Sequence, residues 1–261
     1  MASQAGLKQR FMGKTVLVTG GAGGVGAAAA RMFAQEGAHV GIVDRARENG
    51  ERVAAELRAG GTKAFFAQAD VAVAAQVSAA VEAVTAALGA PTVLFNHAGT
   101  IIVKPFLETT EEEWDWLMAV NVKSMFLVTK AVLPGMIAAG GGSIVCTSSI
   151  SAVAATPMEV VYNTSKGACH MFARAIAVDF RDRNIRCNAV CPGFIRTPHG
   201  VSEVEKLTAL GIDASESVIA AQQGRMCEPE EVARAVLFLA SEEASFINGA
   251  HLFVDNGFTA V

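Results

Sequence analysis

Seven short and almost wholly apolar segments recur along the chain, and they constrain its fold more than any other feature. They are rich in β-branched residues, they are separated by stretches long enough for helices, and they cover Thr15–Thr19, His39–Val43, Lys63–Ala67, Thr92–Phe95, Ser143–Thr147, Ile185–Val190 and His251–Val254. Strands that are apolar on both faces are typical of parallel sheets covered by helices on both sides. The alternation therefore predicts an α/β chain, doubly wound around a seven-stranded parallel sheet.

Local signals between these segments mark helices. Residues 73–88 carry an apolar stripe at helical spacing, and Thr110-x-x-Glu113 is a capping box that opens a long helix running towards Pro134. Pro229, followed by two glutamates, opens another helix. No linker or repeat divides residues 1–261, which predicts a single domain.

One stretch, at about residues 198–224, interrupts the rhythm of strands and helices. A long insertion at the carboxyl end of a parallel sheet is where a substrate lid would lie, so we expect a lid here. The motif Ser202-x-x-Glu205 indicates a short helix inside it. A disordered surface loop is the alternative.

Composition excludes several classes of protein. Of 261 residues, 52% are hydrophobic and 18% are charged, and the net charge of −4 gives no electrostatic reason to expect binding to nucleic acid or an anionic membrane. No apolar run approaches the roughly 20 residues that span a bilayer, and residues 1–10 lack the apolar stretch of a secretion signal. The five cysteines form no C-x-x-C pair, and neither they nor the five histidines have metal-site spacing. We expect free thiols, no metal, no membrane and a cytoplasmic protein.

A glycine-rich loop follows the first predicted strand directly and leads into an alanine-rich helix. Residues of this type let a backbone turn sharply and approach a pyrophosphate at a helix amino terminus, and here they are Gly20, Gly23, Gly24, Val25 and Gly26. Asp44 ends the second strand, where a carboxylate can bind both ribose hydroxyls of NAD and repel the 2′-phosphate of NADP. Arg45 follows and could pair with a phosphate, but we expect NAD as the cofactor.

Tyr162 and Lys166 are four residues apart, which places them one turn apart on the same face of a helix. A nearby cation favours phenolate over phenol and so lowers the pKa of tyrosine from its free value of about 10. Ser149, at the end of the preceding strand, could bind the oxygen that gains or loses the proton. Alone, the pair fits an ordinary surface helix; with the serine and the cofactor motif it predicts interconversion of an alcohol and a ketone.

Together these motifs resemble the short-chain dehydrogenase/reductase family over nearly the whole chain. The residues that carry the resemblance include the glycine loop, Asp70-Val71, Asn96-His97-Ala98-Gly99, Asn121, the trio Ser149, Tyr162 and Lys166, and the turn containing Pro192, Gly193, Ile195 and Thr197. The sequence departs from the family at His97, where a second asparagine is usual. Packing within the protein is the favoured explanation for this histidine, and facing the cofactor cleft is the alternative.

The resemblance implies a single Rossmann-type domain, an NAD(H)-binding enzyme and a set of roles. Tyr162 is expected to be the general acid/base, Lys166 to contact the nicotinamide ribose and lower the pKa of the tyrosine, Ser149 to orient the substrate oxygen and Asn121 to help hold a water. Besides Tyr162 and Lys166, cofactor contacts are expected from the glycine loop, Asp44, Arg45, Asp70, Val71, Asn96, Ala98, Gly99, Pro192, Gly193, Ile195 and Thr197. The family is commonly tetrameric, and the apolar residues Trp114, Trp116, Leu117, Met118, Met125 and Phe126 agree with a homotetramer.

Substrate choice is the least constrained prediction. Family geometry indicates pocket positions at Ser151, Val153, Met158, Glu159, Phe194 and His199, of which the polar ones could bind extra hydroxyls. Since the cellular NAD pool is mostly oxidised, we expect oxidation of a small secondary alcohol, with sugars and polyols slightly ahead of cyclic alcohols. A 3-oxoacyl thioester reductase is the alternative, which Asp44 and the negative net charge disfavour. A non-catalytic dinucleotide sensor is a remote alternative, because such a protein usually lacks the catalytic side chains present here.

Overall fold

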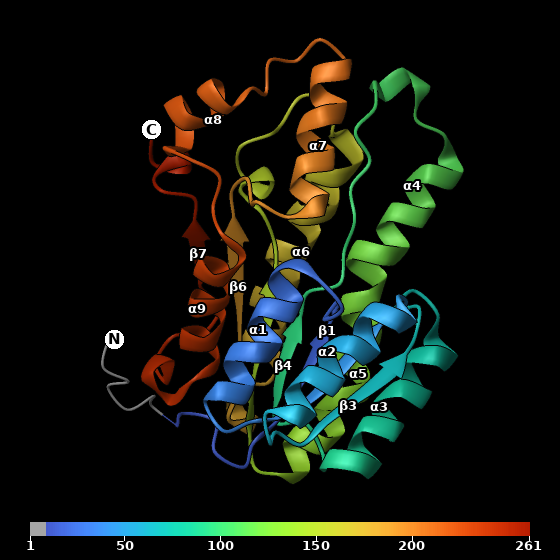
Figure 1. The fold of residues 1–261 in the computed structure, drawn as a ribbon, viewed down its shortest axis with the longest axis vertical. Helices are drawn as coiled ribbons and strands as arrows, with labels where there is room; N and C mark the ends of the chain where they lie inside the picture. Colours follow the sequence, from blue (N-terminus) through green and yellow to red (C-terminus); the bar gives the residue numbers. More distant parts are fainter. Residues whose placement is uncertain (1–8) are drawn as a thin grey trace.

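All seven predicted strands are present and form one parallel sheet. A computed structural model describes residues 9–261, so the prediction about a secretion signal falls largely on residues outside the described part. The sheet has the order β3-β2-β1-β4-β5-β6-β7 (Figure 1). Its strands are β1 Thr15–Thr19, β2 His39–Asp44, β3 Ala64–Gln68, β4 Val93–Asn96, β5 Gly142–Thr147, β6 Ile185–Pro192 and β7 His251–Val254. The predicted boundaries are correct to within two residues.

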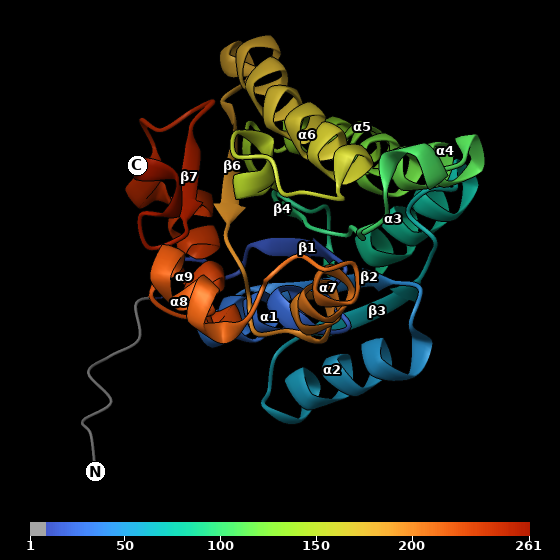
Figure 2. The same cartoon turned by 90° about the horizontal axis from the view of Figure 1, so that it is seen from above.

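Helices cover both faces of the sheet, as the apolar strands required (Figure 2). One face packs against α1 (Gly24–Gln35), α2 (Arg47–Ala59) and α9 (Pro229–Ala240). The other packs against α3 (Ala74–Leu88), α5 (Ser124–Ala138) and α6 (Val160–Asp179). The result is a doubly wound, Rossmann-type domain with two apolar cores, one on each side of the sheet.

The strand order reverses direction between β1 and β4. The chain first builds outward from β1 through β2 to β3, and α3 then carries it back so that β4 pairs with the other edge of β1, with Leu17 opposite Leu94. In open α/β sheets the loops on either side of such a reversal diverge and leave a crevice at the carboxyl ends of the strands. A ligand site is therefore expected above β1 and β4.

The helix predicted from the capping box is longer than expected. Thr110 and Glu113 exchange the two capping hydrogen bonds and open α4 (Glu111–Met118), which continues through a π-helical turn at Ala119–Lys123 into α5. The segment passes through Pro134 and ends at Ala138. Because α4 and α5 are continuous, residues 111–138 are long and apolar enough to cross a membrane by length and composition alone, a test that buried core helices also pass. Of the most apolar window, 44% is buried inside the protein.

Residues 198–224 contain two helices, in place of the single short helix or disordered loop considered from sequence. Helix α7 (Pro198–Ala209) begins at Thr197, whose hydroxyl accepts a hydrogen bond from the backbone N–H of Gly200 at 3.1 Å. Helix α8 (Glu216–Gln223) follows and ends at Gly224. Figure 1 shows both helices beyond the carboxyl end of β6, on the side of the sheet where the crevice opens.

Candidate active site

A cavity of about 360 Å³ lies at the carboxyl ends of the central strands. Its walls come from the loops after β1, β4, β5 and β6, from α6 and from the start of α7. Lining residues include Gly20, Gly23, Gly24, Val25, Asp44, Ala98, Gly99, Ser149, Tyr162, Lys166, Pro192, Gly193, Ile195, Thr197, His199 and Glu203. Most of the residues predicted from separate motifs thus meet in one space.

The glycine loop leaves the floor of this cavity bare of side chains. A Cβ atom on Gly26 would lie only 2.1 Å from the carbonyl oxygen of Gly20, so α1 can pack this close to the end of β1 only with glycine at this position. The N-cap residue of α1, Gly23, has no side chain to bind the first free N–H groups of the helix. These N–H groups and the helix dipole suit an anion such as a pyrophosphate.

Asp44 lies between this cavity and a second one of about 260 Å³. Its carboxylate accepts hydrogen bonds from the backbone N–H of Ala22 at 3.1 Å and of Ala46 at 2.9 Å, which holds the side chain in place and leaves lone pairs free. The second cavity is also lined by Arg45, Asp70 and Val71. The residues present therefore fit a dinucleotide, with the pyrophosphate over the glycine loop and an adenosine beyond Asp44.

Tyr162 and Lys166 lie on α6 as predicted, with the lysine Nζ 5.5 Å from the centre of the phenol ring. The lowering of the Tyr162 pKa that Lys166 was expected to cause is not seen. Burial and the nearby negative charge of Glu203 raise the pKa of Tyr162 above its ordinary value, while the Ser149 hydroxyl opposes this rise. The reason is that the phenol is desolvated and faces carboxyl groups that the sequence pattern did not place beside it.

Lys166 is nearly fully buried and donates a hydrogen bond to the carbonyl oxygen of Thr147 at 3.1 Å. Burial lowers the pKa of its ammonium group. The hydroxyl of Ser149 accepts a hydrogen bond from the backbone N–H of Ser151 at 3.1 Å, which fixes the serine at the end of β5. The three side chains thus converge on one point of the cavity from two elements, the end of β5 and α6.

Two predicted asparagines lie beneath the cavity and do not line it. The amide of Asn121, in the π-helical turn, bonds the backbone N–H and C=O of Thr100 and the hydroxyl of Ser165. Asn96 donates to the carbonyl of Met125 and the hydroxyl of Thr129, so the structure places it as a support between β4 and α5, away from the cofactor cavity. Both amides are used by the protein itself, because they lie under 2% exposed among backbone groups that need partners.

His97 satisfies both explanations considered from sequence. Its Nδ1 atom is 3.0 Å from the Thr147 hydroxyl and its ring stacks on Phe95, while the same side chain lines the cavity. Burial, with the charge of Lys166 adding to it, lowers the pKa of His97 to about 3. The ring is therefore a neutral part of the cavity wall at neutral pH.

Among the predicted substrate residues, His199 is the one that lines the central cavity. Ser151 is buried and bonded to Ser149, whereas Val153 is 58% exposed. Met158 and Phe194 are partly buried and do not line this cavity; Glu159 is fully buried near Glu203 and Tyr162.

Sequence reasoning missed Glu203, which lines the cavity one turn after His199 on α7. A signal for it existed. Thr197-Pro198 is an N-cap followed by proline at the first helical position, and a helix that starts there places residues 199 and 203 on one face.

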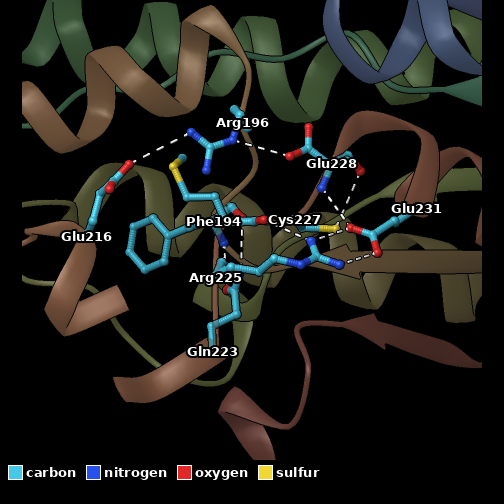
Figure 3. Close-up of polar contacts among 9 residues, drawn as sticks. Phe194, Arg196, Glu216, Gln223, Arg225, Cys227, Glu228 and Glu231 are labelled. Carbon is cyan, nitrogen blue, oxygen red and sulfur yellow. Dashed lines mark hydrogen bonds and ion pairs between the residues drawn. The ribbon is translucent and has the colours of Figure 1, made fainter. Parts of the chain in front are cut away.

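The segment with α7 and α8 is tied to the cavity wall by a polar cluster (Figure 3). Gln223, at the end of α8, is buried; its amide accepts from the N–H of Phe194 and donates to the C=O of Phe194 and of Arg225, all at 2.9 Å. A Cβ on Gly193 would lie 2.0 Å from this amide, so the turn after β6 needs glycine there. Arg196 pairs with Glu228 and Arg225 with Glu231 in the same cluster.

Comparisons with known proteins agree with this architecture. Residues 20–259 match the family model described as enoyl-(acyl carrier protein) reductase. Cyclopentanol dehydrogenase of Comamonas sp. is 42% identical over 255 residues, covering 96% of this chain and 99% of that protein. The chain belongs to the short-chain dehydrogenase/reductase family. A 2,5-dichloro-2,5-cyclohexadiene-1,4-diol dehydrogenase of Sphingobium indicum is a further family member, 37% identical over 258 residues, 97% of this chain and 99% of that one.

The solved structure of L-sorbose reductase from Gluconobacter frateurii, complexed with NADPH and L-sorbose, shows the same fold. It superposes with a TM-score of 0.90 at 32% identity, over 98% of this chain and all of the other. As a short-chain dehydrogenase/reductase, the protein is an oxidoreductase that acts on CH–OH groups and interconverts a secondary alcohol and a ketone.

Within the described part of the chain, no cluster of three or more His, Cys, Asp or Glu side chains suits a metal ion, and all five cysteines are free and buried.

Proposed function

We propose that this protein oxidises a cyclic secondary alcohol to the ketone with NAD. The observation that carries the proposal is the convergence of Ser149, Tyr162 and Lys166 on a cavity that continues over the glycine loop to Asp44. We favour a cyclic alcohol over a sugar or polyol as the substrate, because two of the similar proteins are named for cyclic substrates. The similarity to the sorbose reductase means that sugars are still to be tested.

In the proposed mechanism Tyr162, in its phenolate form, accepts the proton of the substrate hydroxyl, and a bound nicotinamide would accept the hydride from the carbon. Ser149 donates a hydrogen bond to the substrate oxygen and keeps it within reach of the phenol. Lys166 lies beside the phenol, with its Nζ 5.5 Å from the ring centre, and its expected lowering of the tyrosine pKa stays a prediction. Asn121 acts through the loop at Thr100, and its expected part in holding a water stays a prediction.

The preference for NAD rests on the charge of Asp44. Its carboxylate is held by two backbone N–H groups at the end of β2, facing the second cavity. A ribose bearing two hydroxyls can donate to it, whereas a 2′-phosphate would be repelled. The NADPH in the sorbose reductase structure makes this a point to test, and Arg45 beside Asp44 is the residue that would favour NADP.

The remaining parts of the proposal concern the lid, assembly and location. The segment 198–224 would act as the lid, because α7 carries His199 and Glu203 into the cavity wall. A homotetramer would cover Trp114, Trp116 and Phe126, which are 36%, 44% and 49% exposed; Leu117 and Met125 belong to the core and contribute nothing to such an interface. Free buried thiols and the mixed burial of residues 111–138 support a cytoplasmic protein that does not enter a membrane.

The test is formation of reduced nicotinamide with cyclopentanol, cyclohexanol and a set of sugars and polyols, with NAD and NADP in parallel. Turnover should occur with NAD, and Tyr162→Phe should lower kcat by at least about 100-fold while dinucleotide binding persists. Asp44→Ser should raise the use of NADP relative to NAD. Turnover that survives in Tyr162→Phe would refute the assigned acid/base.

A 3-oxoacyl thioester reductase is the second candidate, because the description of the matching family model names an acyl-carrier-protein substrate, although the enoyl group in that description is reduced at a C=C bond and not at a ketone. It predicts consumption of NADPH with a 3-oxoacyl thioester and no activity on cyclic alcohols. If the protein is a non-catalytic sensor, Tyr162→Phe should leave its role in the cell unchanged. If it is either of the two enzymes, the same variant should lose activity.

A further inference from the structure

Two acids lie beside Tyr162 that the proposed reaction does not use. Glu203 lines the cavity from α7, one helical turn beyond His199, while Glu159 precedes the first residue of α6. The negative charges of both raise the pKa of the Tyr162 phenol, so both carboxyl groups lie close to the reacting position. We call Glu159 and Glu203 the acidic pair.

Glu159 is buried in an unusual way. Its exposed fraction is 0%, and no side chain forms a hydrogen bond of good geometry with either carboxyl oxygen. Only Thr156 lies close enough to lower the pKa of this carboxyl group, and burial outweighs its effect. The residue before it, Met158, has φ +61°, a left-handed conformation that side chains with a Cβ rarely adopt, and its carbonyl is held by the backbone N–H of Lys104 at 2.7 Å. The turn that buries the Glu159 carboxyl group therefore contains a strained backbone conformation at Met158.

No cation neutralises the acidic pair within residues 9–261. Lys104, whose backbone bonds Met158, pairs with Glu113, and no ion pair joins Lys206 on α7 to Glu203. Leaving a buried carboxyl group without a partner is costly, and such groups usually occur where a ligand or water completes their bonding. Because Glu203 lines the cavity, a partner for its carboxyl group enters from the side of the substrate. Glu159 does not line the cavity and acts on this position through its charge.

The charge state of the pair indicates what that partner is. Burial, with the two acids repelling each other, raises the pKa of Glu159 to about 9, and burial raises that of Glu203 to about 7. At neutral pH the pair therefore holds at least one proton, and a protonated carboxyl group both donates and accepts hydrogen bonds. An alcohol hydroxyl has the same double capacity, whereas an ammonium ion only donates and would need ionised carboxylates.

We propose that Glu203, supported by the buried Glu159, forms a subsite for a second hydroxyl group next to the one that is oxidised, so that cyclic diols are preferred over simple cyclic alcohols. This inference rests on the proposed function. The acidic pair adjoins Tyr162, so the second hydroxyl lies on a carbon close to the reacting carbon, as in a 1,2-diol. Tyr162 and Ser149 hold the reacting oxygen, and Glu203 holds its neighbour and selects which face of the ring approaches the nicotinamide site.

The experiment compares kcat/KM for cyclopentane-1,2-diol with that for cyclopentanol, in the wild type and in Glu203→Leu. The ratio of the two values should fall about tenfold in the variant, the worth of one hydrogen bond to a buried polar group. Glu203→Gln keeps an amide that donates and accepts, and it should retain most of the ratio. Glu205→Leu, an exposed position on the same helix, is the matched control and should leave the ratio unchanged.

The possible results distinguish failure of the diol subsite from failure of the proposed alcohol oxidation. Turnover of cyclopentanol with a ratio that Glu203→Leu does not change refutes the diol subsite alone. Preference for 2-aminocyclopentanol over the diol, lost in Glu203→Gln, refutes it in favour of an ammonium site. No turnover of any of these alcohols with NAD or NADP refutes the proposed function and the subsite together.

Discussion

Replacing Gln223 with leucine should loosen the attachment of the α7–α8 segment to the rest of the protein. The side chain is 2% exposed, and its amide makes three hydrogen bonds of 2.9 Å to the backbone of Phe194 and Arg225 (Figure 3). Leucine has a similar volume and can make none of them. The Phe194 N–H would lose its partner outright, whereas the carbonyl of the exposed Arg225 can bind water instead.

The magnitude follows from these differences. The two hydrogen bonds to Phe194 are worth about 1 kcal/mol each and the unpaired N–H costs up to about 1 kcal/mol more, whereas the Arg225 carbonyl exchanges its bond for one to water. The free energy of unfolding should therefore fall by about 2–3 kcal/mol. For a chain of this size that corresponds to a melting temperature lower by roughly 5–10 °C. If the segment detaches without global unfolding, the same energy appears as faster hydrogen exchange in α8.

Two measurements check this reasoning, urea denaturation and amide hydrogen exchange of residues 216–223. Gln222→Leu, at the exposed neighbouring position, is the matched control and should change neither. Gly193→Ala tests the same contact from its other side, because its Cβ would occupy the space of the Gln223 amide. Its cost should shrink when it is combined with Gln223→Ala. A loss below about 1 kcal/mol in both measurements would show that the amide does not anchor the segment.

Three further predictions concern other parts of the molecule. Gly26→Ala places a Cβ 2.1 Å from a backbone oxygen and should weaken dinucleotide binding at least about tenfold in a fluorescence titration, whereas Gly167→Ala, where nothing lies within 4 Å, should not. The pKa of Glu159 rises on folding from 4.5 to about 9, so this group's contribution to stability is fully present below pH 4.5 and is lost as the pH rises towards 9. Glu159→Gln should therefore flatten the fall in melting temperature between pH 5 and 9, and an unchanged slope would contradict the assignment. Phe126→Glu should dissociate the proposed tetramer in sedimentation, and a monomeric wild type would refute that assembly.

Patterns that act over a few residues were predicted correctly from sequence. The seven strands, the capping box at Thr110 and the helix at Pro229 depend on neighbours along the chain, as does the spacing of Tyr162 and Lys166. The cofactor loop could also be recognised, since the glycine at position 26 is required by a contact with residue 20, only six residues away. Order along a doubly wound sheet then brought the ends of β1, β4, β5 and β6 together without further information.

The tertiary structure decided the surroundings of these residues. Lys166 is in reach of Tyr162, but burial and Glu203, which is 41 residues further along the chain, set the direction of the shift in the tyrosine pKa. Asn96 is buried and bonds Met125 and Thr129, which the spacing of the motif alone did not indicate. By itself the sequence determined the sheet, the dinucleotide loop and the catalytic trio, because each depends on local spacing and periodicity. Which side chains are desolvated, paired or left without a partner around that trio depends on elements distant in sequence, so only the folded structure decided it.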